Sequence, residues 1–111
     1  MSNTDTVKDV YMARRFERAL NRLPEIEANL VEDEIERIIE CPWIGEKKKG
    51  DLSHIFVHKF HISGQEQLLG YHFDEGNLIL VLLSLGPHEN FYRDAKKGRK
   101  ADLRVISDSS G

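Results

Sequence analysis

The stretch IFVHKFHISGQEQLLGYHFDEGNLILVLLSL, residues 55–85, decides the fold. It holds three runs rich in apolar, β-branched and aromatic residues, 55–62, 67–73 and 78–85. Short segments with Gly, Asn and Asp separate these runs, which is typical of β-hairpins. The third run is apolar at nearly every position, so we expect it to be a central strand. The stretch therefore predicts a small antiparallel sheet.

Two amphipathic helices are predicted before the sheet. After Met12 the apolar positions recur at three- and four-residue spacing, and they are Phe16, Ala19, Leu20 and Leu23. A second helix follows Pro24 and ends before Pro42, and its apolar positions are Ile26, Leu30, Ile35, Ile38 and Ile39. The tight turn between them predicts an antiparallel αα-hairpin. Residues 7–11 form either a brief strand or the entry to the first helix.

The order of elements predicts an α+β fold. We expect one domain over residues 1–111, with a core at about residues 7–98. In this fold the αα-hairpin packs on one face of the small antiparallel sheet, and a short basic C-terminal helix follows. The polar end, residues 105–111, is expected to be a flexible tail.

Charge is distributed unevenly along the chain, although the formal net charge is only −3. Residues 25–40 hold seven acidic side chains and one arginine, a local balance of −6. Residues 91–104 hold six basic side chains and two aspartates, a local balance of +4. Only the basic segment and the lysine triplet at residues 47–49 are therefore suited to nucleic acid, and we expect the acidic second helix to face away from it.

The sequence indicates a cytoplasmic protein without a membrane span. Cys41 is the single cysteine, so an internal disulfide and a thiolate metal cluster are excluded. The start, MSNTDTVKD, lacks the basic and apolar regions of a signal peptide. No apolar run approaches the ~18 residues that a membrane helix needs.

The segment LGPHENFYRDAKKGRK, residues 85–100, holds the strongest candidate chemistry. His88 exchanges protons near neutral pH, and i,i+4 spacing puts it on one helix face with Tyr92. RNA cleavage by transesterification needs a general base, a general acid and cations around the phosphate. His61, near the end of the first strand, is the expected acid–base partner of His88.

Cationic and aromatic side chains complete this hypothesis. Arg93 and Lys59 would hold phosphate, and Tyr92 would position a base. Contacts to RNA are expected from a larger basic set: Lys47, Lys48, Lys49, Lys59, Lys96, Lys97, Arg99 and Lys100. No metal or cofactor is expected, because clean ligand spacings are missing.

The other histidines carry no assigned role. On a regular strand His54 and His58 would point to one face and His61 to the other. His54 and His72 are expected to be partly exposed strand histidines.

The chain also resembles a known family. The order FERALNRLP, an Ile/Glu helix ending in Pro, KKKGDL, hairpin strands with LLGYHF, and LLSLGPHENFYRDAKK is similar to the RelE/ParE superfamily of bacterial toxins. The resemblance spans roughly residues 11–97. It implies a RelE/ParE-like fold and the toxin of a type II toxin–antitoxin pair, bound in a hetero-oligomer by its cognate antitoxin. The RelE branch cleaves mRNA in the ribosomal A site without a metal, whereas the ParE branch inhibits DNA gyrase.

The histidine-based YafQ type is the closer likeness within this superfamily. Its C-terminal histidine, with an aromatic residue four positions on, matches His88 and Tyr92, and its strand histidine aligns with His61. Its acidic residue falls near Gln65 or Glu66. Other members have an arginine three residues before the strand tyrosine, where this chain has Leu68, so an arginine-based mechanism is not expected.

The resemblance implies a ribosome-dependent mRNA endoribonuclease with the ribosome and mRNA as partners. Two alternatives stay open: a ParE-like gyrase inhibitor without catalysis, and a catalytically inactive toxin-derived binding module. Substitution of His88 distinguishes them, because only the first function depends on proton transfer by this residue.

Overall fold

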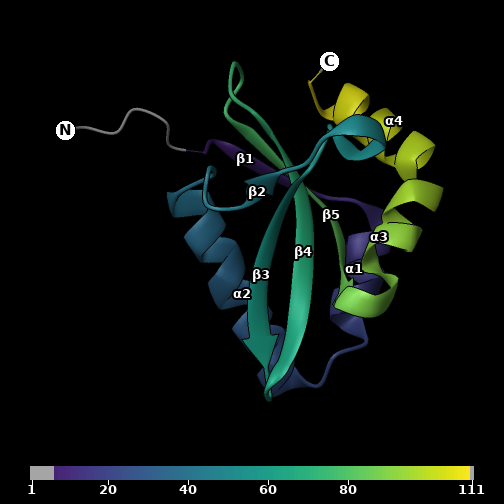
Figure 1. The fold of residues 1–111 in the computed structure, drawn as a ribbon. Coiled ribbons are helices and arrows are strands. Elements are labelled where there is room, and N and C mark those ends of the chain that lie inside the picture. The colour runs from purple at the N-terminus through teal and green to yellow at the C-terminus, as the bar shows by residue number, and fades with distance from the viewer. Residues whose placement is uncertain (1–6, 111) are drawn as a thin grey trace.

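The computed structural model describes residues 7–110; residues 1–6 and 111 lie outside it. The elements follow in the order β1 (Asp9–Met12), α1 (Arg14–Asn21), α2 (Glu25–Glu40), β2 (Glu46–Lys47), a 3-10 turn (Gly50–Leu52), β3 (Phe56–Ile62), β4 (Gln65–Asp74), β5 (Ile79–Pro87), α3 (His88–Lys97) and α4 (Arg99–Ser110) (Figure 1). The α+β class and the helix–helix–strand–strand–strand–helix order are confirmed. No helix of this described part is long and apolar enough to cross a membrane.

The sheet is larger and less regular than expected. Its five strands follow the order β1-β5-β4-β3-β2. The three long strands pair antiparallel as predicted, and so do β2 and β3, but β1 and β5 are parallel, so the complete sheet is mixed. The parallel pair forms because the chain leaves β1 through both helices and returns to its side only with β5. For residues 7–11 a strand or the entry to the first helix was predicted, and the strand is correct, because β1 spans Asp9–Met12.

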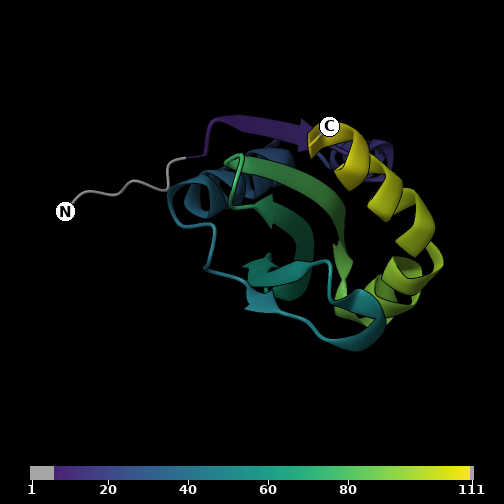
Figure 2. The same ribbon diagram turned by 90° about the horizontal axis from the view of Figure 1, so that it is seen from above.

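Helices cover both faces of the sheet, not one face as expected (Figures 1 and 2). On one face α1 and α2 place Phe16 and Ile38 in a core with Phe60 and Leu82. On the other face α3 places Phe91 in a second core. The cause lies in β5, where every residue from Ile79 to Ser84 is buried, so both of its faces require a covering layer.

A β-bulge in β5 changes which side chains face α3. Tyr71 pairs with Leu82 and Gly70 pairs with Ser84, which leaves Leu83 as an extra residue. Leu83 belongs to the core under α3, and Ser84 lies within reach of Phe91 on the same side. Two consecutive residues therefore point the same way, and the alternation of the strand is reversed from there on.

The C-terminal region is helical up to Ser110, where a flexible tail was expected from residue 105. Val105 and Ile106 are partly buried and pack against the core under α3, and this apolar contact orders the segment. Helix α3 ends at Gly98 before α4 starts. A β-carbon at residue 98 would overlap the Arg15 guanidinium, so glycine at this position lets Arg15 of α1 approach closely.

Candidate functional site

Helix α3 presents His88 and Tyr92 together. Pro87 has extended backbone angles (φ −69°, ψ 156°) and directly precedes the helix, so its fixed ring geometry sets the helix start at His88. The ring centroids of His88 and Tyr92 are 5.7 Å apart and the planes meet at 78°. The two side chains share one face of α3, as their spacing predicts.

A lysine from the loop before β3 completes this face. The ammonium group of Lys48 lies 5.2 Å from the centroid of the Tyr92 ring. It also forms a 2.9 Å ion pair with Glu46, and this hydrogen bond is the main reason why the pKa of Lys48 is raised. Sequence reasoning named Lys48 and Tyr92 separately but gave no signal that they meet, because their contact depends on the sheet bringing β2 beside α3.

The lysine triplet does not act as one cluster. Lys47 lies over the ring of Phe56, with its ammonium group 5.2 Å from the centroid, and Phe56 belongs to the core under α1 and α2. Lys49 is exposed before the 3-10 turn. Adjacent residues of a strand point to opposite faces, so only Lys48 of the three reaches Tyr92.

Two further candidates come from β3. Phe60 packs in the core under α1 and α2, whereas Val57 packs in the core under α3. Lys59 and His61 alternate with Phe60, so they lie on the α3 side, where both are exposed. The charge of Lys59 also contributes to lowering the pKa of Glu46, after the larger effect of the hydrogen bond from Lys48. Lys59 is therefore part of the same face.

The strand register aligns His61 with His88 across the sheet. His61 pairs with Glu66, and the next residue of β4, Gln67, pairs with Pro87. His61, Glu66 and His88 thus form a row over β3, β4 and the start of α3. Two strand spacings separate the backbones of the two histidines, about 10 Å. The structure therefore aligns His61 and His88 in one row, and within the described residues the two side chains do not contact each other.

Arg93 lies apart from this row. It donates a 2.9 Å hydrogen bond to Asn90 and is 3.9 Å from Asp94, both on its own helix. No contact within the described chain joins it to His88 or Tyr92.

The C-terminal cations are dispersed over different surfaces. Lys96 follows Tyr92 by one helical turn and is exposed. Lys97 faces α1 instead. Arg99 donates a 2.9 Å hydrogen bond to the carbonyl of Asp51, which ties α4 to the 3-10 turn, and Lys100 is exposed on α4.

The remaining histidines are structural. His58 is buried and lies 2.7 Å from the carboxylate of Glu34 on α2. His54 lies in the turn before β3, and its side chain is only 8% exposed and 3.8 Å from Asp102 of α4, so the expectation of a partly exposed strand histidine was wrong for this residue. It also lies on the opposite side from His58, because the chain bends before β3 begins. His72 contacts the backbone carbonyl of His54. In the described residues no three His, Cys, Asp or Glu side chains are grouped to hold a metal ion.

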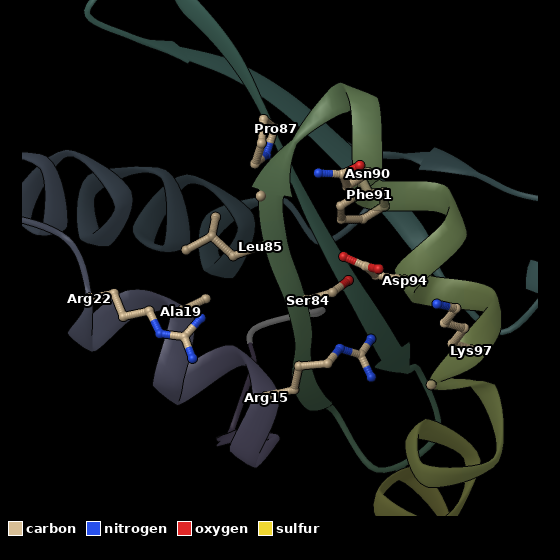
Figure 3. A pocket seen from close by; sticks show the side chains of 12 residues that line it. Arg15, Ala19, Arg22, Ser84, Leu85, Pro87, Asn90, Phe91, Asp94 and Lys97 are labelled. Atoms are coloured by element: carbon tan, nitrogen blue, oxygen red, sulfur yellow. The ribbon is translucent and has the colours of Figure 1, made fainter.

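A cavity of about 440 Å³ lies on the other side of α3, between this helix and α1 (Figure 3). Its floor is the end of β5 and its walls carry Arg22, Asn90 and Lys97. Sequence reasoning missed it, because no local pattern indicates that α1 and α3 flank the same strand.

Comparison with known proteins identifies the family. A family model described as the ParE-like toxin of type II bacterial toxin–antitoxin systems matches residues 10–96. No curated protein matches.

Several solved structures have a similar fold. A double mutant of the E. coli toxin RelE in the free state shares 15% identity with a TM-score of 0.61, over 76% of this chain and 86% of that chain. The intact E. coli RelBE toxin–antitoxin complex shares 17% identity with a TM-score of 0.58, over 70% of this chain and 93% of that chain. The Mycobacterium tuberculosis toxin–antitoxin complex RelBE2 shares 23% identity with a TM-score of 0.57, over 72% of this chain and 96% of that chain. With the family match across most of its length, the chain belongs to the ParE-like toxins of type II toxin–antitoxin systems, within the RelE/ParE superfamily.

Proposed function

We propose that this toxin cleaves mRNA on the ribosome, with His88 as the main acid–base residue. The observation that carries the proposal is the exposed face on which Lys48 lies over Tyr92 and Tyr92 contacts His88. A cation, an aromatic ring and a proton-exchanging group side by side are what a phosphodiester and its base require. His61 and Glu66 continue this face on β3 and β4.

The chemistry is a transesterification. The 2′-oxygen of one nucleotide forms a bond to phosphorus, and the bond from phosphorus to the 5′-oxygen of the next nucleotide breaks. One histidine accepts the proton of the 2′-hydroxyl and the other protonates the leaving 5′-oxygen. His61 and His88 share these two steps, and a phosphate bound between their side chains explains why they stand in one row without touching.

The cations of this face stabilise the charge that develops on the phosphate. Lys48, which lies over Tyr92, takes the phosphate-binding role that was predicted for Arg93, and Lys59 lies on the same face. The position of a catalytic arginine in other members is taken by Leu68, which is fully buried. This placement supports a histidine-based mechanism of the YafQ type.

The other basic residues contact ribosomal RNA. They lie on exposed parts of the lysine loop, α3 and α4, and they are Lys47, Lys49, Lys96, Arg99 and Lys100. The acidic helix α2 covers the opposite face of the sheet from α3, so its charge does not oppose this contact (Figure 2). Association is expected to weaken steeply with salt.

A cognate antitoxin is the second partner. The similar structures include complexes of RelE-type toxins with their antitoxins from E. coli and M. tuberculosis. We infer a hetero-oligomer of the same kind for this chain, formed in the cytoplasm.

The test is to incubate the purified protein with programmed ribosomes and to map the 5′ ends of the mRNA. His88→Ala is expected to lower the cleavage rate by about 10²–10⁴, the usual contribution of a general acid or base. Glu89→Ala, at the next exposed position of the same helix, is the matched control and keeps activity. Cleavage that survives His88→Ala refutes the assigned role.

Gyrase inhibition is the second candidate function. It is favoured by the ParE-like description of the matching family and by the net charge of −3, which is unusual for an RNA-binding protein. Under this alternative mRNA stays intact, DNA supercoiling by gyrase is inhibited, and His88→Ala retains toxicity. A protein inactive in both assays would be a binding module.

A further inference from the structure

The cavity between α1 and α3 has the size of a small-molecule site. Its volume of about 440 Å³ falls within the roughly 300–1,000 Å³ that is usual for ligand pockets. The two helices form its walls and the end of β5 forms its floor (Figure 3). Neither His88 nor Tyr92 lines it, so a molecule bound here leaves the His88–Tyr92 face open.

Two cations stand on opposite walls of the cavity. Arg22 follows the last residue of α1, and Lys97 is the last residue of α3 (Figure 3). In the part of the chain that the structure describes, no ion pair or hydrogen bond occupies either charged group, whereas Arg15 is bound to Asp102. The two groups are therefore available to an anion between the helices.

The cavity also contains neutral hydrogen-bond donors. Ser84 is only 5% exposed, and its Oγ has no partner among the described residues. Asn90 accepts a 2.9 Å hydrogen bond from Arg93 through Oδ1, so its amide nitrogen is the group that points toward the end of β5 (Figure 3). A buried polar atom without a partner is costly, so a ligand acceptor that reaches Ser84 is favoured.

One carboxylate restricts the kind of anion. Asp94 is the only acidic side chain among the described residues that line the cavity, and the group nearest to its carboxylate is Nε of Arg93, 3.9 Å away. Asp94 repels a bare dianion, but it accepts a hydrogen bond from a ligand that carries hydroxyl groups. Leu85 and Phe91 add an apolar surface. A matching ligand therefore combines an anion, hydroxyl donors and an apolar part.

A nucleoside monophosphate has these three parts. Its phosphate monoester carries a charge of about −1.5 to −2 at pH 7 and offers three acceptor oxygens to the two cations. Its ribose hydroxyls donate hydrogen bonds, and its base has apolar faces. A dicarboxylate such as succinate lacks the donors, and inorganic phosphate lacks the apolar part.

We propose that the cavity between α1 and α3 binds a free nucleoside monophosphate, with its phosphate at Arg22 and Lys97 and its ribose hydroxyls at Asp94. The base packs on Leu85 and Phe91. Because the ligand bridges the two helices only in the folded protein, it also stabilises the fold. The proposal goes beyond mRNA cleavage and does not depend on it.

The experiment titrates the ¹⁵N-labelled full-length protein with adenosine 5′-monophosphate and follows the amide signals by NMR. The signals of Arg22, Ser84 and Lys97 are expected to shift together. Arg22→Gln is expected to weaken binding by about tenfold or more, because a charge-assisted hydrogen bond is lost. Lys97→Gln tests the opposite wall independently.

Arg18→Gln is the matched control, because it removes the same charge from α1 outside the cavity lining. It should bind adenosine monophosphate like the wild type. Circular dichroism confirms that each variant is folded. Equal losses for Arg18→Gln and Arg22→Gln would show that only the overall charge attracts the ligand, and would overturn the proposal.

The contact with Asp94 is tested by a comparison of two ligands. Wild-type protein should bind adenosine monophosphate more tightly than its 2′,3′-dideoxy analogue. In Asp94→Ala the two affinities should become equal, although both rise because a repelling charge is gone. An unchanged affinity ratio in Asp94→Ala contradicts the proposed placement of the ribose.

Other results would also overturn the proposal. They are the absence of binding at millimolar adenosine monophosphate, equal affinity for adenosine, inorganic phosphate or succinate, and competition at the same signals by a hexauridine RNA. His88→Ala should bind adenosine monophosphate normally. Lost mRNA cleavage with intact nucleotide binding therefore refutes only the proposed function, and the reverse result refutes only the nucleotide site.

Discussion

The guanidinium group of Arg15 donates two hydrogen bonds, of 2.9 and 3.1 Å, to the carboxylate of Asp102, and it thereby joins α1 to α4. The Asp102 side chain is only 2% exposed. Burial raises the pKa of Asp102, and the hydrogen bonds from Arg15 act in the opposite direction. The position of the last helix therefore depends on a cation from the first one.

Replacement of Arg15 by methionine leaves this carboxylate buried without its main partner. Breaking a buried pair costs about 3–5 kcal/mol, and we expect about 3 kcal/mol because Arg15 itself is one-third exposed. Urea denaturation measures the loss of unfolding free energy. Arg18→Met on the same helix should change it by less than about 0.5 kcal/mol. An equal effect of both variants would show that the pair does not stabilise the fold.

Gly98→Ala is expected to act through the same pair. Its β-carbon would overlap Nη1 of Arg15, so the guanidinium must move away from Asp102. We expect destabilisation in the wild-type background and little further loss in Arg15→Met, measured as a double-mutant cycle. Strict additivity of the two substitutions contradicts this mechanism.

The stability of the protein is expected to fall in mild acid because of His54. Burial lowers the pKa of His54 from 6.5, although the charge of Asp102 partly opposes this. Below pH 6.5 the unfolded chain binds this proton before the folded protein does, so stability is present above pH 6.5 and is lost as the pH falls toward the folded pKa. Chemical denaturation between about pH 7.5 and 5.5 should show a smaller slope for His54→Gln. An unchanged slope would exclude His54 as the cause.

Gly70 is required where α3 packs on the sheet. A β-carbon there would lie 2.5 Å from Oγ of Ser84 and 2.9 Å from Cζ of Phe91. Gly70→Ala should destabilise the protein by about 1–3 kcal/mol through overpacking, as measured by urea denaturation. Ser84→Ala should recover part of this loss, because it removes the nearer atom without breaking a hydrogen bond. No recovery in the double variant would place the strain at Phe91 alone.

Tyr92 is expected to contribute through its ring. Tyr92→Phe keeps the surface that Lys48 covers, and it should retain mRNA cleavage on ribosomes. Tyr92→Ala removes the stacking surface and should weaken mRNA binding by about 1–3 kcal/mol. Lys48→Met should slow cleavage, whereas Lys8→Met, next to β1 at the opposite edge of the sheet from β2, serves as its control. Similar rates for Phe and Ala at residue 92 would argue against base stacking.

Local sequence patterns predicted the helices and the three long strands well. The expected strands 55–62 and 78–85 correspond to β3 and β5, and Pro24 marks the start of α2 as expected. Turn residues and apolar periodicity act over a few neighbours, so the sequence displays them directly.

Relations between distant elements were not predictable in this way. The parallel pairing of β1 with β5, the burial of His54 against α4 and the contact of Lys48 with Tyr92 all depend on how separate elements pack. The i,i+4 pair His88 and Tyr92 was predictable, since both residues belong to one helix. The same contrast explains why Arg93 was chosen from its position in the sequence, although the cation that lies over Tyr92 in the structure is Lys48.

The extra residue at Leu83 decides which face of the sheet each later side chain of β5 occupies. The strand residues after it, up to the start of α3 at His88, lie on the opposite faces of the sheet from those they would occupy if the same sequence formed a strand without a bulge. Deletion of this one leucine would therefore remove the bulge and give a regular strand in which each later side chain keeps its present face.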